Sequence, residues 1–451
     1  MVRKALWKLR FVWSAGLFLL ATAASVVMTP LRPAAQAPAA AEASPAQITF
    51  TRHIAPILQE HCQVCHRPGM MAPMSLLTFE ETRPWASSIK RRVAAREMPP
   101  WYVDRNIGIQ KFKNDRSLRD AEIATIVKWV DNGAPMGDPA DMPHPRQFED
   151  ADAWHIGKPD LIVSMPQEHI VPATGADEFL RPVADSGLTE DRYIRAVETK
   201  PGAAAHMAVH HALTHLIENP QNPEDSTRDS FLNEYSVGKN GDIFPAGSGR
   251  LMKAGTKIRF DLHYHSYGEQ VRDRTEVGLV FYPKGYVPSH ILKAKPLAAA
   301  SDLDIPGGDP NARTDGYYLM SSAARITAYQ PHMHNRGKAQ CLEAIYPDAQ
   351  VETLNCVRFR QQWQVVYTYA DDTAPLLPAH TILHVIGWHD NSSANRLISD
   401  PRNWVGYGQR TVDEMSFAWI SWYDMTDEEY EQEVEARRTQ RDKVTTATHS
   451  H

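Results

Sequence analysis

The spacing of apolar residues changes near residue 140, and this change limits the folds open to the chain. Between residues 48 and 136, apolar side chains recur every three or four positions, which is typical of amphipathic helices. Ile123, Ile126 and Val130 share one face of a helix expected at 118–132. Beyond residue 150, short stretches rich in aromatic and β-branched residues alternate with Pro, Gly and Asn turns, a pattern typical of antiparallel strands. Two of the expected strands cover 324–329 and 365–369. We therefore predict a multi-domain protein with a small all-α domain followed by two all-β antiparallel, jelly-roll-like sandwich domains.

The length of 451 residues also favours several domains, because one hydrophobic core rarely organises so long a chain. A Pro- and Asp-rich stretch at 137–150 is the clearest boundary, and a weaker one falls near 286–295. The expected divisions are 1–47 (signal peptide or anchor with an Ala/Pro linker), 48–140 (helical domain), 155–290 (first sandwich), 291–425 (second sandwich) and 426–451 (charged tail).

The N-terminus resembles an export signal, because basic residues precede an apolar run from Phe11 to about Met28. We expect a periplasmic or otherwise exported protein. Membrane contact is expected only if this segment is retained as an anchor. In an oxidising compartment Cys341 and Cys356 are expected to form a disulfide, with a free thiol as the alternative. A net charge of −6 without a basic excess argues against nucleic acid as a partner.

The sequence Cys62-Gln63-Val64-Cys65-His66 is a C-x-x-C-H motif. Its two thiols can form thioether bonds to haem, and the adjacent imidazole then lies at the iron. A zinc site or a disulfide is the alternative. Met98, on a loop after a predicted helix, is our choice for the sixth iron ligand. The segment from about 50 to 137 resembles class I cytochromes c, which implies a covalent haem c and electron transfer.

Three groupings of histidine occur in the predicted β region. Residues i and i+2 of a strand point to one face, so an H-x-H pair can present two imidazoles to one ion, whereas adjacent histidines do so only in a distorted strand. Imidazoles without clustered thiolates suit copper, zinc or iron. The groupings are His210 with His211, His263 with His265, and His332 with His334.

The order of these histidines resembles the copper type II, ascorbate-dependent monooxygenases, the family of peptidylglycine α-hydroxylating monooxygenase and dopamine β-monooxygenase. The resemblance covers most of residues 155–425, although Ala212 stands where the family usually has methionine. The matching stretches are Val-His-His at 209–211, Phe-Asp-Leu-His-Tyr at 260–264, Ala-Tyr-Gln-Pro-His-Met-His-Asn-Arg-Gly at 328–337 and Asp-Glu-Met at 413–415.

The resemblance implies two copper ions and a reaction in which O2 hydroxylates a C–H bond of a small-molecule substrate. The electrons would come from an external donor, either an ascorbate-like reductant or another cytochrome, and the haem would relay them. His210, His211 and His263 would bind the electron-transfer copper, with His265 as the alternative to His263. The catalytic copper would be bound by His332, His334 and Met415, whose thioether suits Cu(I).

The substrate is less constrained than the metals. The peptide-amidating branch of the family grips a carboxylate with Arg, Asn and Tyr, and Gln330, Phe417 and Trp419 stand at those positions here. A peptide carboxylate would lack its charged partner, so we expect a small hydrophobic or aromatic substrate. Two alternatives stay open: a non-catalytic electron-transfer or copper-binding multidomain cytochrome, and a peroxidase-like haem centre with substrate-binding β domains.

Overall fold

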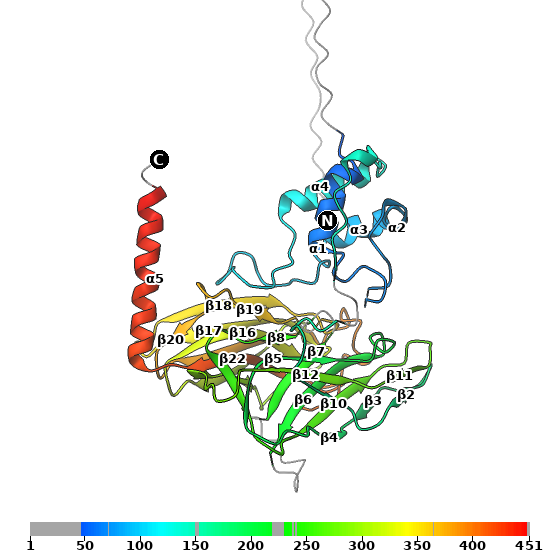
Figure 1. The fold of residues 1–451 in the computed structure, drawn as a ribbon. Helices are drawn as coiled ribbons and strands as arrows, with labels where there is room; N and C mark the ends of the chain where they lie inside the picture. The colour runs from blue at the N-terminus through cyan, green and yellow to red at the C-terminus, as the bar shows by residue number, and fades with distance from the viewer. Residues whose placement is uncertain are drawn as a thin grey trace, which may run out of the picture. The chain divides into compact units, whose positions relative to one another are not determined.

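The computed structural model describes residues 47–70, 72–148, 153–218, 230–236, 239, 241–363 and 365–448. Among these residues, strand outweighs helix, at 35% against 16% (Figure 1). The expected signal or anchor falls on residues outside this part. Within the described ranges, no helix is both long and apolar enough to cross a membrane.

Short helices form the N-terminal part. Phe50 packs against the rings of Phe79 and Trp129, and the helix α2 begins with a capping box between Thr78 and Glu81. Ile89 and Ile126 complete the small core between the helices. The elements are a π-helical turn η1 (Phe50–Ile54), α1 (Ala55–His61), α2 (Phe79–Thr82), a 3-10 turn η2 (Arg83–Trp85), α3 (Ala86–Ala94), α4 (Asp120–Asp131) and a 3-10 turn η3 (Pro139–Asp141).

The expected fold class, with a separate small all-α cytochrome c domain over 48–140, is wrong. The chain is mostly β, and residues 98–116, which we call the arm, leave the helices and join strands far along the sequence. Val103 bridges Val357, Phe112 bridges Tyr369, and Trp101 is buried in a core made by those later strands. Residues 48–451 accordingly form one compact unit. Helical periodicity is a local signal, so it did not reveal where the arm is buried.

The next residues form two facing sheets around a core that includes Ile194, Val197, Phe260 and Leu262. One sheet has the order β1-β12-β5-β9-β13, and the other has the order β3-β10-β6-β7. The strands are β1 (Leu161–Ser164), β2 (His169–Val171), β3 (Glu178–Leu180), β4 (Val183–Asp185), β5 (Arg192–Lys200), β6 (Val209–Ile217), β7 (Phe231–Ser236), β8 (Asp242–Ile243), β9 (Ser248–Met252), β10 (Lys257–Tyr264), β11 (Val271–Asp273), β12 (Glu276–Phe281) and β13 (His290–Ile291).

A second pair of sheets follows, with the orders β14-β22-β16-β19 and β15-β21-β17-β18. A disulfide joins Cys341 of β17 to Cys356 of β18, where the two residues lie directly opposite each other. The strands are β14 (Lys293–Leu297), β15 (Ala312–Leu319), β16 (Ala324–Met333), β17 (Gly337–Ile345), β18 (Val351–Arg358), β19 (Tyr367–Thr368), β20 (Leu376–Leu377), β21 (Ile382–His389) and β22 (Ser416–Asp424); the charged end of the chain forms the helix α5 (Asp427–Thr448).

Candidate metal centres

Two neighbouring strands carry the first histidine cluster. His210 and His211 lie near the start of β6, and His263 lies near the end of β10, where it pairs with His211. The next pair joins Tyr264 to Val209, so the register shifts and His210 is the extra residue of a β-bulge. In a regular strand His210 and His211 would point to opposite faces. The bulge explains how both can face His263.

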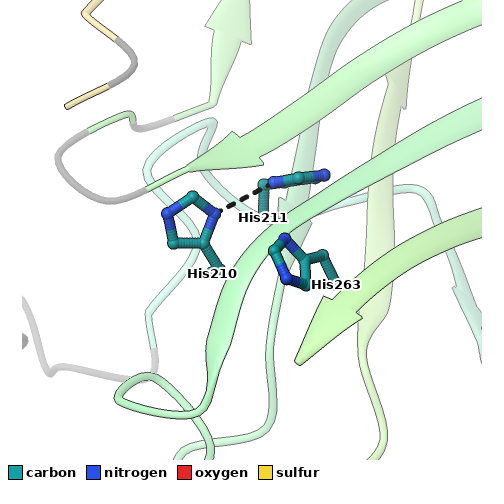
Figure 2. A group of neighbouring side chains, drawn as sticks. All are labelled: His210, His211 and His263. Carbon is teal, nitrogen blue, oxygen red and sulfur yellow. Dashed lines mark hydrogen bonds between the residues drawn. The ribbon is translucent and has the colours of Figure 1, made fainter. Parts of the chain in front are cut away.

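The three imidazoles of this cluster converge on one point (Figure 2). The Nδ1 atoms of His210 and His211 are 3.1 Å apart, and the His263 ring centroid lies 5.0 Å from each of the other two. One ligand nitrogen from each residue lies within 4.8 Å of the others. Burial lowers the pKa of His210 to about 4 and that of His211 well below its ordinary value, so both rings are neutral at pH 7.

Asp177 orients the third imidazole of the cluster. Nε2 of His263 donates to its carboxylate at 2.8 Å, which leaves Nδ1 of His263 for a metal. Hydrogen bonds from His265 and His263 outweigh the effect of burial and hold the pKa of Asp177 below its usual range. His265 uses Nδ1 to reach the same carboxylate, and its side chain is 62% exposed. The geometry therefore favours His263 over His265 as a ligand.

The second histidine pair lies where β16 ends. The ring centroids of His332 and His334 are 5.5 Å apart, and His332 stacks on Phe417 of β22 at 4.4 Å. Nδ1 of His334 donates to the Asp413 carbonyl at 3.2 Å, which leaves Nε2 for a metal. Burial lowers the pKa of His334. Met415 directly precedes β22, whose pairing with β16 brings it to the same end of the sheet.

Glu414 joins the two backbone segments that carry these ligands. Its buried carboxylate accepts hydrogen bonds from the backbone N–H groups of His334, Met415 (3.0 Å) and Arg336 (2.9 Å). Burial raises the pKa of Glu414 to about 7, against the opposing effect of those N–H groups. The sequence pattern singled out Met415 for its thioether, whereas the bonding of Glu414 depends on tertiary contacts.

The sheets that carry the two clusters are in contact. Nε2 of Gln330 on β16 donates to the buried Glu234 carboxylate on β7 at 2.9 Å, and the ring centroids of Phe231 and Trp419 lie 4.4 Å apart. After burial and the nearer histidines, His332 and His334 also help to lower the pKa of His211. The two clusters therefore lie within electrostatic range of each other.

A cavity of about 310 Å³ adjoins this contact, near the lower end of the size range for small-molecule sites. Gln330, Trp419 and Phe231 line it, as do the charged residues Lys239 and Asp242. With both charged and apolar side chains, this lining is more mixed than the small hydrophobic or aromatic substrate expected from the sequence would need. Phe417, the third expected substrate residue, stacks against His332 instead of appearing in this lining.

The C-x-x-C-H residues lie together on the turn after α1. The backbone N–H groups of Cys65 and His66 both donate to the Cys62 carbonyl, at 3.1 and 2.9 Å. Both cysteines are free thiols, and burial raises the pKa of Cys62 to about 12. Nδ1 of His66 donates to the Met74 carbonyl at 3.1 Å, which leaves Nε2 for an iron. Met98 follows α3 and lines a separate cavity of about 610 Å³.

Sequence reasoning missed three residues that shape these centres: Asp177, Glu234 and Phe179, whose ring stacks on His263 at 4.3 Å. Each is a single side chain without a spacing pattern. For Asp177, the signal would have been a carboxylate expected beside any metal-binding histidine.

No protein-family model and no curated protein matches the chain. Among solved structures, the major capsid protein of bacteriophage PM2 is similar at 9% identity and a TM-score of 0.23, over 55% of this chain and 97% of that chain. A B. subtilis oxalate decarboxylase is similar at 9% identity and a TM-score of 0.14, over 60% of this chain and 78% of that chain. Scores this low carry no argument about fold or function.

Proposed function

We propose that the protein is an exported, copper-dependent monooxygenase that hydroxylates a C–H bond of a small molecule with O2. Cys62 and Cys65 would hold a haem c, which would supply the electrons when bound. The observation that best supports this function is the bulge in β6, which turns His210 and His211 toward His263 on the neighbouring strand. A bulge that aligns three imidazoles suits a metal site, because bulges often re-aim side chains near functional sites.

The donor sets suit copper at both clusters. Three imidazoles without a thiolate fit a copper that cycles between two oxidation states, and the thioether of Met415 with two imidazoles fits a softer site that holds Cu(I). When bound, copper would supply one-electron storage at the first cluster and reaction with O2 at the second.

The protein's own residues would hold these ligands in place. Asp177 and the Asp413 carbonyl each fix one histidine tautomer, so a ring nitrogen with a free lone pair faces the metal. Glu414 ties the His334 backbone to the Met415 backbone. The Gln330–Glu234 hydrogen bond and the Phe231–Trp419 contact hold the two sheets together, which keeps the distance between the clusters fixed.

The C-x-x-C-H turn fits a covalent haem, because its two thiols are free and the His66 ring is held through Nδ1. When bound, the haem would supply electrons to the first cluster. An ascorbate-like reductant or another cytochrome would reduce it in turn. Met98 remains our choice for the distal ligand.

Metal analysis of the full chain produced with haem attachment tests the proposal. We expect one haem and about two coppers per chain, and the loss of about one copper in Met415→Leu. Met333→Leu, a similar change at a buried methionine of β16, should keep both coppers. A protein that holds haem without copper would rule out the hydroxylation.

Kinetics test the electron route separately. Reduced haem should reoxidise when copper, O2 and a substrate are supplied, and more slowly in a His210→Ala variant that lacks a ligand of the first cluster. Oxygen uptake that never couples to a product would instead favour the non-catalytic electron carrier.

A further inference from the structure

Away from the two histidine clusters, three side chains gather where α1 ends and α4 begins. Glu60 and His61 are the last two residues of α1, and Glu122 is the third residue of α4. One ligand atom from each lies within 4.8 Å of the others. Cys62, the first cysteine of the C-x-x-C-H turn, directly follows His61.

The His61 imidazole is largely shielded from water. Its side chain is only 10% exposed, and Nε2 is shielded from water without a hydrogen-bond partner among the described residues. Buried polar atoms of native proteins are rarely left in this state, because each forfeits its hydrogen bonds to water. The unpaired nitrogen points to a ligand between His61 and the two carboxylates.

The distances within the group fit a shared metal better than hydrogen bonds. Nε2 of His61 lies 3.6 Å from Oε1 of Glu122 and 3.7 Å from Oε2 of Glu60. Both distances are too long for a hydrogen bond. Tetrahedral zinc, with bonds of roughly 2.0–2.2 Å to nitrogen and oxygen, places its ligand atoms about 3.4 Å apart. These two distances would have to shorten by only about 0.2–0.3 Å, and all three ligand atoms already lie within 4.8 Å of one another.

The charges at this place also favour a divalent cation. Two carboxylates balance a double positive charge, and the imidazole adds a neutral donor. Glu122 already accepts hydrogen bonds from the backbone and the guanidinium of Arg119. The Arg119 side chain is 77% exposed, so a metal would have to displace only a surface group.

We propose that Glu60, His61 and Glu122 bind a divalent cation of the zinc class, with water completing the coordination. A site with three protein ligands leaves an open position, so the metal would be exchangeable. It would link the end of α1 to the start of α4 immediately before the haem-attachment turn. This site is independent of the copper centres and of the proposed hydroxylation.

Hydrogen exchange of the copper-saturated full chain, with and without added Zn²⁺, tests the site. The Cys62 amide bonds to the Leu58 carbonyl at 2.9 Å, and the Ile123 amide bonds to the Arg119 carbonyl at 3.1 Å. Peptides that cover these amides should exchange about 100-fold more slowly at a Zn²⁺ concentration 100 times the Kd, because opening must release the metal.

Three variants complete the test. Glu60→Gln removes an exposed ligand outside the small core and should weaken Zn²⁺ binding at least about tenfold. His61→Gln should abolish the protection, whereas Glu80→Gln, at an exposed acidic residue of α2, should leave it unchanged. Protection that is absent from the wild type, that survives in His61→Gln, or that appears only around the copper ligands would overturn the proposal.

Discussion

Glu414 holds the backbone of two proposed metal ligands, His334 and Met415, without being a ligand itself. A carboxylate offers only acceptors, and this one receives N–H groups from His334, Arg336 and Met415. Glutamine at the same place would turn an NH2 donor toward one of these N–H groups. The geometry of the second centre therefore depends on the charge of a residue that does not touch the metal.

We expect Glu414→Gln to bind copper about 10- to 100-fold more weakly at the second centre and normally at the first. Copper stoichiometry measures the loss, and X-ray absorption should show that the copper–sulfur scattering from Met415 disappears. Glu343→Gln, at another largely buried glutamate, is the control. An unchanged copper–sulfur signal in Glu414→Gln would contradict this role.

His215 should make the stability of the fold depend on pH. Burial lowers its pKa from 6.5 to about 4, and the ring lies against Ser230 and Phe231. The unfolded chain takes up a proton near pH 6.5, whereas the folded chain resists it down to about pH 4. The stabilisation is therefore fully present above pH 6.5 and is lost as pH falls toward 4, by ~3 kcal/mol at most.

His215→Gln should flatten this part of the pH profile. The measurement is the free energy of unfolding of the metal-free protein between pH 4 and 7, as the difference between the variant and the wild type. His144→Gln, at an exposed histidine, should leave the profile as it is. Equal slopes for His215→Gln and the wild type would show that the ring takes up its proton at the same pH in the folded and the unfolded chain, which would contradict the prediction.

At the scale of helices and strands, local sequence patterns predicted the position of α4 better than they predicted the lengths of the strands. The helix expected at 118–132 is α4, because its apolar repeat is contained in one stretch of sequence. The strand expected at 324–329 continues as β16 to Met333, since its polar end is held by pairing with β22. The strand expected at 365–369 shrinks to the two residues of β19.

The candidate metal centres also contain some features that the sequence could predict and others that it could not. Their histidines and Met415 could be proposed from spacing and resemblance, because those residues lie in recognisable motifs. The β6 bulge could not, since it exists only in the register between β6 and β10, where the paired His211 and His263 are 52 positions apart in the sequence. Asp177 reaches His263 across 86 residues, a contact that no local pattern encodes.

At the scale of the whole molecule, the arm couples the helices to the second pair of sheets. Trp101 is 7% exposed and packs its ring 4.8 Å from Tyr367 and 5.5 Å from Phe112. The Asp104 amide donates to the Cys356 carbonyl at 2.7 Å. These contacts predict that the helical part and the sheets unfold together.

Trp101→Ala should lower the free energy of unfolding by about 3–5 kcal/mol. It should also allow the helical part and the sheets to unfold in separate transitions. Helical circular dichroism and β-sheet infrared absorption should then change at different denaturant concentrations, whereas they coincide in the wild type. Trp85→Ala, at a tryptophan that is 45% exposed, is the control. Coincident transitions in Trp101→Ala would show that the arm does not provide the coupling.

The arm also determines where the chain can be cut into fragments that fold. A fragment that begins at residue 150 would keep every proposed copper ligand. Val357 and Tyr369 would nevertheless lose their bridges to the arm and would form an exposed apolar patch that favours aggregation. A fragment that ends at residue 140 would carry the arm as an unpaired loop between α3 and α4, with its apolar side chains exposed. Replacement of the helical part by recombination at 137–150 would therefore succeed only if the arm and the strands that it bridges were exchanged together.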